Sequence, residues 1–186
     1  LEQAIVHARR DRSRLGLMYF DLDNFKPIND NFGHAVGDLL LKEVARRVVG
    51  CVRESDTVAR LGGDEFVVLL PRLENDKDVL PVAEKIRDAL SEAFIFAGDS
   101  LEISASIGVA IYPEHGDDEK TLTHNADAAM YQAKENGRNQ VVLYQAGLYL
   151  QVQTRRASLR VFRRCAGNDH RRVEPGRGAG SRIKMP

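Results

Sequence analysis

Residues 60–70 read RLGGDEFVVLL, which places two adjacent acids, Asp64 and Glu65, between a glycine pair and an apolar run. Paired glycines adopt positive φ angles without strain, so the stretch is typical of a hairpin turn between two strands. On that interpretation alone, the acids would be turn residues with no chemistry of their own. The rest of the sequence has to decide between a plain turn and a site that needs two carboxylates here.

The composition is that of an ordinary globular domain. The 186 residues are 43% hydrophobic and 29% charged, and no apolar stretch approaches the length that spans a membrane. The first residues lack the pattern of a signal peptide. Two distant cysteines, Cys51 and Cys165, do not make a disulfide framework. We therefore expect a reduced, cytoplasmic protein with no membrane segment in this chain.

The balance of charge changes along the chain. The 27 Lys and Arg residues equal the 27 Asp and Glu residues, yet residues 151–186 hold ten of the former and two of the latter. This segment is rich in Arg and Gly and has no hydrophobic period, which is typical of a disordered tail. Because aromatic residues are not interleaved with the basic ones, nucleic-acid binding is not favoured. The sequence predicts a domain over 1–146 and a basic, disordered tail over 147–186.

Hydrophobic periodicity predicts alternating strands and helices. Strands are predicted over 15–20, 101–112 and 141–144, with a hairpin formed by 56–61 and 66–70. Helices are predicted over 39–52, 79–90 and 121–135, and a further helix over 1–10. The segment 23–38 is predicted to be a loop. This order favours an α+β fold in which helices flank a largely antiparallel sheet.

A third acid lies where it can join the two in the turn. Asp21 closes the first predicted strand, so the hairpin can bring Asp64 and Glu65 beside it at one edge of the sheet. Three carboxylates repel one another unless a cation lies between them, and hard oxygen ligands select Mg²⁺ or Mn²⁺. The glycines leave room for a phosphate close to the backbone. The pattern favours metal-assisted phosphoryl or nucleotidyl transfer.

Three motifs in order resemble the GGDEF family of diguanylate cyclases. They are GGDEF at 62–66, FDLDNFKPINDNFGHAVGD at 20–38 and ADAAMYQAKENGRN at 126–139. The match runs from about residue 15 to 144. The resemblance implies a palm-like fold with a ferredoxin-like core, related to nucleotide cyclases. It also implies an enzyme that condenses two GTP into cyclic di-GMP and two pyrophosphates.

The resemblance assigns the metal and the reacting groups. It implies that Asp21, Asp64 and the backbone carbonyl of Leu22 hold Mg²⁺ or Mn²⁺. Glu65, with help from Asp64, would deprotonate the ribose 3′-hydroxyl, and Lys26 would offset charge that develops on the phosphates. From the residues alone, Asp23 is open to another role, in which it orients the loop.

The resemblance also assigns substrate contacts. Lys134 and Arg138 would grip the β- and γ-phosphates, while Asn29 and Asp38 would read the guanine edge with His34 nearby. Plainer interpretations stay open for several of these residues. Asp38 can cap the following helix, His34 can be a loop or packing residue, and the two cations alone would be an ordinary solvated face.

Residues 53–56, RESD, precede the glycine pair by five positions and resemble the family's inhibitory site, which binds the product. Arg53 offers a planar fork to a phosphate or a guanine edge, and Asp56 can accept from guanine N1–H and the 2-amino group. The alternative is a surface ion pair between Arg53 and Asp56, worth at most about 1 kcal/mol.

The chain departs from the family at both ends. The segment Asp-x-Leu-Thr-Gly-Leu-x-Asn-Arg that usually precedes the first helix is missing, which indicates an N-terminally truncated domain that is normally fused to other signalling domains. Since the product is two-fold symmetric, activity should need a homodimer.

Two alternative functions remain: a catalytically weak domain that binds GTP or cyclic di-GMP as a regulatory module, and a scaffold in which the motif is only a turn. Formation of cyclic di-GMP from GTP separates the three.

Overall fold

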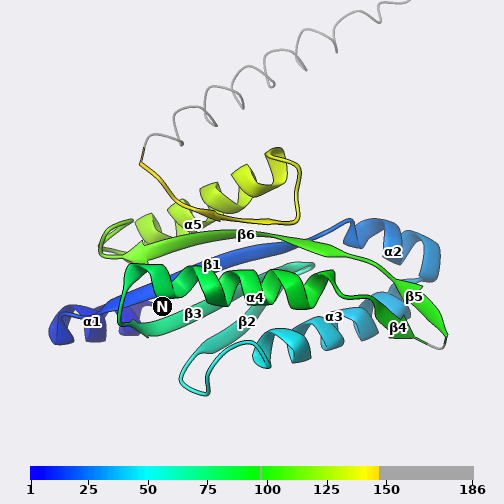
Figure 1. Cartoon of the computed structure of the whole chain (residues 1–186), viewed down its shortest axis with the longest axis horizontal. Coiled ribbons are helices and arrows are strands. Elements are labelled where there is room, and N and C mark those ends of the chain that lie inside the picture. Colours follow the sequence, from blue (N-terminus) through cyan, green and yellow to red (C-terminus); the bar gives the residue numbers. More distant parts are fainter. Residues whose placement is uncertain (97, 147–186) are drawn as a thin grey trace, which may run out of the picture. The chain divides into compact units, whose positions relative to one another are not determined.

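Strand β1 (Arg14–Asp23) forms from the apolar run that begins at Leu15 and lies at the centre of a five-stranded sheet. It pairs antiparallel with β3 (Glu65–Leu73) on one side and with β6 (Ser104–Tyr112) on the other. Beyond them, β2 (Thr57–Gly62) pairs antiparallel with β3, and β7 (Gln140–Leu143) pairs parallel with β6. The strand order is β2-β3-β1-β6-β7 (Figure 1). The predicted α+β class with a largely antiparallel sheet is confirmed.

The structure, a computed structural model, describes residues 1–96 and 98–146. The predicted tail over 147–186, with its boundary at residue 146, lies outside the described residues and is not tested. Across the described part, none of the helices combines the length and apolar character needed to cross a membrane.

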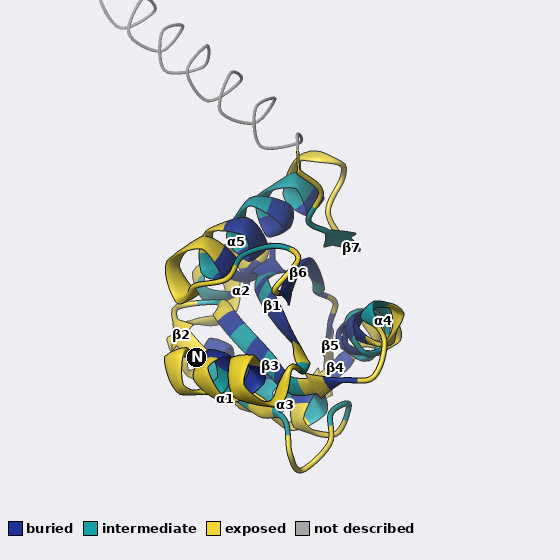
Figure 2. Ribbon diagram, turned by 90° about the vertical axis from the view of Figure 1, so that its left-hand side faces the viewer, coloured by how far each residue is buried: buried dark blue, intermediate teal, exposed yellow. Residues whose placement is uncertain are grey.

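Helices cover both faces of the sheet, as the alternation of apolar residues along β1 requires. Met18, Phe20 and Leu22 face the side of α3 (His34–Val49) and α4 (Val79–Ser91), where the larger core lies. Leu15 and Leu17 face α1 (Glu2–Asp11) and α5 (Glu119–Glu135). Figure 2 shows the buried residues concentrated between these layers. The alternation also points Asp21 and Asp23 toward the α5 side.

The prediction of a loop over 23–38 is wrong. This segment forms α2 (Phe25–Phe32) and the first turn of α3. Pro27 lies in the first turn of α2, where a backbone N–H needs no intrahelical partner, so it does not prevent the helix. Gly33, with φ of 82°, ends α2 by donating its N–H to the Asn29 carbonyl and lets the chain turn into α3.

Three smaller elements were also missed. A short 3₁₀ helix, η1 (Asp76–Asp78), precedes α4 and is closed by a capping box with Asn75. The strands β4 (Phe94–Phe96) and β5 (Asp99–Leu101) pair as a separate two-stranded sheet, so the strand predicted over 101–112 begins only at Ser104. The other predicted helices and strands are present within a few residues of their expected ends.

Helix α5 lies against β6 with no side chain between the two backbones at Gly108. A Cβ atom there would come within 2.0 Å of the Met130 nitrogen and 2.1 Å of the Ala126 carbonyl oxygen. Those distances are far below van der Waals contact, so only glycine allows this close approach. The position of α5, and of the residues at its end, is therefore fixed by this contact.

Arg47 joins α3 to the end of α4. Its guanidinium donates to the carbonyls of Ala89, Glu92 and Ala93 at 2.7–2.8 Å and stacks over the Phe94 ring at 3.7 Å. Ala89 lies in the last turn of α4 and Glu92 is its C-cap, where a helix end leaves carbonyls without intrahelical partners. A cation here also suits the negative end of the helix dipole.

We expect Arg47→Met to lower the free energy of unfolding by about 2 kcal/mol, because three carbonyls lose a charged donor. The neighbouring Arg46 is the matched control, since its side chain is 72% exposed against 15% for Arg47 and its guanidinium donates to Glu43. Urea denaturation of both variants measures the difference. Equal losses for Arg46→Met and Arg47→Met would contradict the assigned role.

Candidate functional site

The glycine pair forms the expected hairpin turn between β2 and β3. Gly63 adopts φ of 55°, and the Arg60 Nε–H donates to its carbonyl at 2.9 Å. The Leu22 N–H at the end of β1 donates to the Asp64 carbonyl at 3.2 Å. The turn is thus held from both sides, and a Cβ on either glycine would meet nothing within 4 Å. Open space borders the backbone at the place where a phosphate was expected to approach.

The acids of β1 and β3 meet at this edge of the sheet. Asp21 pairs with Glu65 in the β1–β3 register, and Asp64 precedes Glu65 in the turn. Burial raises the pKa of Asp21 above its ordinary value, and the charges of Asp64 and Glu65 raise it further. Lys134 opposes this, since its Nζ lies 2.9 Å from Asp21 Oδ2. The charges of Asp64, Glu65 and Lys134 therefore all act on the Asp21 carboxylate.

The donor set suits a hard divalent cation, because only carboxylate and carbonyl oxygens are offered. Within residues 1–96 and 98–146, however, no group of three or more His, Cys, Asp or Glu side chains lies close enough to hold a metal ion. Lys134 balances the charge of Asp21 instead. The residues fit a metal by their chemistry, and the backbone carbonyl of Leu22 would have to complete the set.

The two cations from the end of α5 both face acids of β1. Lys134 pairs with Asp21, and the Arg138 Nε lies 3.9 Å from Asp23 Oδ1. Arg138 stands in the turn after α5, and its side chain is 56% exposed. Lys134 is therefore held in an ion pair and is not simply a solvated residue, whereas Arg138 remains largely exposed. Lys26 lies exposed in the first turn of α2.

A groove of about 320 Å³ runs between α3 and the β2–β3 hairpin. Its lining combines a carboxylate, two cations and apolar side chains: Asp38, Leu41, Lys42, Ala45, Val49, Val58, Ala59, Arg60 and Phe66. Asp38 lies inside α3, which begins at His34 with Gly33 as its N-cap, so the interpretation of Asp38 as a helix cap is wrong.

The other predicted base contact, Asn29, lies where α2 packs on α3. A Cβ on Gly37 would come within 1.9 Å of Asn29 Oδ1, so the glycine is what makes room for this side chain. Gly37 directly precedes Asp38 in α3, so Asn29 packs against the helix that carries the other predicted contact. His34 is exposed at the start of α3.

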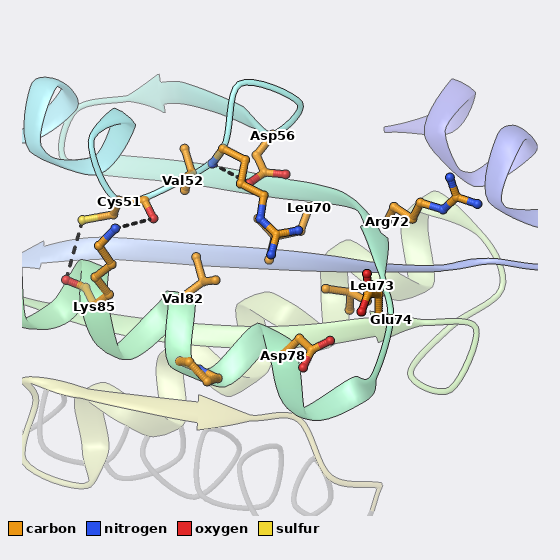
Figure 3. A pocket seen from close by; sticks show the side chains of 12 residues that line it. Cys51, Val52, Asp56, Leu70, Arg72, Leu73, Glu74, Asp78, Val82 and Lys85 are labelled. Carbon is orange, nitrogen blue, oxygen red and sulfur yellow. Dashed lines mark hydrogen bonds between the residues drawn. The ribbon is translucent and has the colours of Figure 1, made fainter.

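Arg53 and Asp56 line a separate cavity of about 480 Å³ (Figure 3). The Asp56 carboxylate accepts from the Arg53 backbone N–H at 2.8 Å and from Ser55 Oγ at 3.3 Å. Among the described residues no ion pair joins the two side chains, so the alternative of a surface ion pair between Arg53 and Asp56 is wrong. The Arg72 and Lys85 side chains also line the cavity, and Lys85 Nζ donates to the Cys51 carbonyl at 3.2 Å.

Sequence reasoning missed Arg60, which holds the turn, and the groove residues Leu41 and Phe66. Arg60 stands three residues before Gly63, a spacing across which a side chain on β2 can reach the turn it leads into. Lys85 lies on α4, 29 positions after Asp56, so that no local spacing pattern points to it.

Comparisons with known proteins agree on one family. The family model described as diguanylate cyclase, GGDEF domain, matches residues 1–140. The chain is 46% identical over 153 residues to the bifunctional diguanylate cyclase/cyclic di-GMP phosphodiesterase MucR of Pseudomonas aeruginosa, covering 82% of this chain and 22% of MucR. It is 45% identical over 139 residues to the diguanylate cyclase TpbB of the same species, covering 74% of this chain and 32% of TpbB. The chain thus spans a fifth to a third of the length of these curated relatives.

Solved structures give the same result. The crystal structure of the TpbB GGDEF domain matches with a TM-score of 0.77 at 42% identity, covering 79% of this chain and 92% of that one. The GGDEF domain of DgcB from Caulobacter crescentus, solved in complex with c-di-GMP, matches with a TM-score of 0.70 at 30% identity, covering 77% and 85%.

We expect Gly63→Ala to lower the free energy of unfolding by about 1 kcal/mol, because a side chain at positive φ is strained. Gly62 is the matched control, since it has equally open surroundings and no positive φ. Thermal or urea denaturation of the two variants measures the effect. A loss for Gly62→Ala as large as that for Gly63→Ala would contradict a conformational cause.

Proposed function

This chain belongs to the diguanylate cyclase GGDEF domain family, and we propose that it condenses two GTP into cyclic di-GMP and two pyrophosphates. The observation that carries the proposal is the pairing of Asp21 with Glu65 beside an open glycine turn, with the cations Lys134 and Arg138 facing the same strand. Acids that can hold a cation, a base and phosphate-binding cations are what nucleotidyl transfer requires.

In the proposed reaction, the 3′-oxygen of one GTP attacks the α-phosphorus of the other, and the bond to pyrophosphate breaks. Glu65, exposed at the turn, takes the proton of the 3′-hydroxyl. Lys26 offsets the charge on the reacting phosphate. Asp21, Asp64 and the Leu22 carbonyl would hold a Mg²⁺ or Mn²⁺ ion, which would supply positive charge at the same place. A second, equivalent step closes the ring.

The remaining contacts select and hold the substrate. Lys134 and Arg138 bind the β- and γ-phosphates, which is consistent with their position at the end of α5. Asp38 and Asn29 accept and donate at the guanine edge. Adenine lacks the N1–H and 2-amino donor pair, so it would leave the carboxylate unpaired, a loss that discriminates by about 10⁴-fold. The groove beside Asp38 supports this assignment because Phe66 and Leu41 offer apolar walls to a base.

The proposed reaction needs two protomers. Each site has one set of phosphate and base contacts, and the product is two-fold symmetric, so two sites must face each other. The product then gains its two phosphodiester bonds from equivalent steps. Specific activity should rise with protein concentration, since association precedes chemistry.

We expect Asp64→Asn and Glu65→Gln each to lower the rate of cyclic di-GMP formation by at least about 100-fold, the size of effect that loss of a general base or metal ligand produces. The denaturation midpoint should hold, because both acids lie at a turn rather than in the core. The assay follows product from GTP and Mg²⁺ at several protein concentrations. Glu119→Gln, an acid outside the site, is the control. Equal product from parent and site variants would refute the assignment.

We also propose that the cavity lined by Arg53 and Asp56 binds the product and inhibits synthesis. The guanidinium of Arg53 suits a phosphate or a guanine edge, and Arg72 and Lys85 add positive charge to the same cavity. DgcB, a relative, was solved in complex with c-di-GMP. This site also supports the second candidate function, a regulatory module that binds cyclic di-GMP with little or no synthesis.

We expect Arg53→Ala to weaken cyclic di-GMP binding by about tenfold or more, since a charged hydrogen bond is lost. Inhibition by the product should be non-competitive with GTP in the parent and absent in the variant. Titration calorimetry and initial rates measure both effects, with the exposed Arg10→Ala on α1 as the control. Identical product affinity in parent and Arg53→Ala would overturn the site.

A further inference from the structure

Asp23 is a buried acid that the proposed reaction does not use. It is 3% exposed, and its carboxylate accepts three hydrogen bonds: from Ser104 Oγ at 2.7 Å, from Ser106 Oγ at 2.8 Å and from the Asn139 N–H at 3.1 Å. The serines belong to β6, whereas Asn139 belongs to the turn after α5. One carboxylate therefore connects the end of β1 with a neighbouring strand and with a turn more than 100 residues away in sequence.

The turn that Asp23 contacts has an unfavourable backbone conformation. Gly137, Arg138 and Asn139 adopt successive positive φ angles of 113°, 64° and 47°. Positive φ is easy for glycine but not for an arginine, so the surroundings must hold this conformation. The Arg138 N–H donates to the Ala133 carbonyl at 3.0 Å, and Ser91 Oγ donates to the Asn139 side chain at 3.0 Å. Asp23 supplies the acceptor for the next backbone N–H.

The same turn carries a cation that faces the site. Arg138 follows Lys134 by four residues, and Lys134 pairs with Asp21, two residues before Asp23 on β1. The Arg138 Nε is 3.9 Å from Asp23 Oδ1, too far for a close hydrogen bond, and most of its side chain remains exposed. Asp23 thus fixes the backbone of the turn and leaves the guanidinium available to a ligand.

We propose that Asp23 is a positioning residue that holds the turn over 137–139 so that Arg138 can bind the phosphates of GTP. This inference rests on the proposed function, because it takes a nucleoside triphosphate as the ligand of that turn. Asp23 does not touch the substrate and does not hold the cation, since its oxygens are occupied by three donors. It acts through the position of Arg138.

The test measures ligand affinity and turn structure separately. The ligand is a GTP analogue with a methylene group between the α- and β-phosphates, bound with Mg²⁺ and followed by calorimetry. We expect Asp23→Ala to weaken its binding by about tenfold or more, the effect of a displaced charged contact. In kinetics with GTP, KM should rise more than kcat falls. Asp23→Asn keeps the shape and one acceptor, so it should recover part of the affinity.

A double-mutant cycle identifies the route of the effect. If Asp23 acts through Arg138, then Asp23→Ala should add little further loss in an Arg138→Ala background. Hydrogen exchange at the Asn139 amide, read by NMR, should be faster in Asp23→Ala than in the parent. Asp118→Ala is the matched control: Asp118 caps the other end of α5, so its loss should destabilise that helix without touching the turn over 137–139. It should leave the Asn139 amide and the analogue affinity unchanged.

Each outcome bears on the proposal. Full additivity with Arg138→Ala, or equal analogue affinity in the parent and Asp23→Ala, would overturn it while the proposed function stands. If Asp23→Ala does not fold, the same measurements are made on Asp23→Asn. An Asp23→Asn variant that binds the analogue as tightly as the parent, although its Asn139 amide exchanges faster, would overturn the proposal. A parent that binds no analogue would overturn the proposed function and this inference with it. A parent that binds the analogue but makes no product would overturn only the proposed synthesis.

Discussion

Strand β1 is hydrogen-bonded on both sides, to β3 and to β6, and the site exists only while both pairings keep their register. The β3 pairing puts Asp21 opposite Glu65, and the β6 pairing puts Asp23 opposite Ser104. Because successive side chains of a strand point to opposite faces, a slip of one residue would turn these acids toward α3 and α4 and away from α5. The apolar residues of β1 prevent that slip, since each must stay in its own core. Packing in the middle of the strand therefore determines the chemistry at its end.

The acids and the cations reach this edge by different routes. Asp21 and Glu65 come from strands of the sheet and Asp64 from the turn before β3, whereas Lys134 comes from the helix laid across the sheet and Arg138 from the turn after that helix. The helix can deliver its last turn to the right place only because Gly108 lets its backbone rest directly on β6. Burial makes the charge of Asp21 unfavourable, as the direction of its pKa shows, and the nearby lysine compensates in part.

Much of the fold was predictable from the sequence, because its signals are local. The apolar run at 15–20, the paired glycines and the helical spacing over 79–90 and 121–135 each identify an element without knowledge of its neighbours. The two helices within 23–38 were not predictable in this way. Their formation depends on Asn29 packing against Gly37 and on a bend at Gly33, contacts that link residues of two separate helices.

The candidate site, like the fold, has parts that were predictable from the sequence and parts that were not. The acids and the glycine turn could be found because their residue types and order already suggest a chemistry. The partners of those acids could not, since the pairing of Asp21 with Lys134 spans 113 residues and depends on how α5 crosses the sheet. The same holds for Asp23, whose role as an acceptor for three donors is invisible until β6 and the turn after α5 are placed beside it.

The contact between Lys134 and Asp21 has a consequence for the order of events under the proposed function. Asp21 Oδ2 is paired with Lys134, so a divalent ion that took this oxygen would displace the ammonium group. The displaced ammonium group would then be available to the phosphates that arrive with the ion. Ion and nucleotide would then favour each other's binding. The ion would release Lys134 for the phosphates, and the phosphates would release Asp21 for the ion. The lysine would exchange one negative partner for another, which keeps the edge of the sheet close to charge balance in both states.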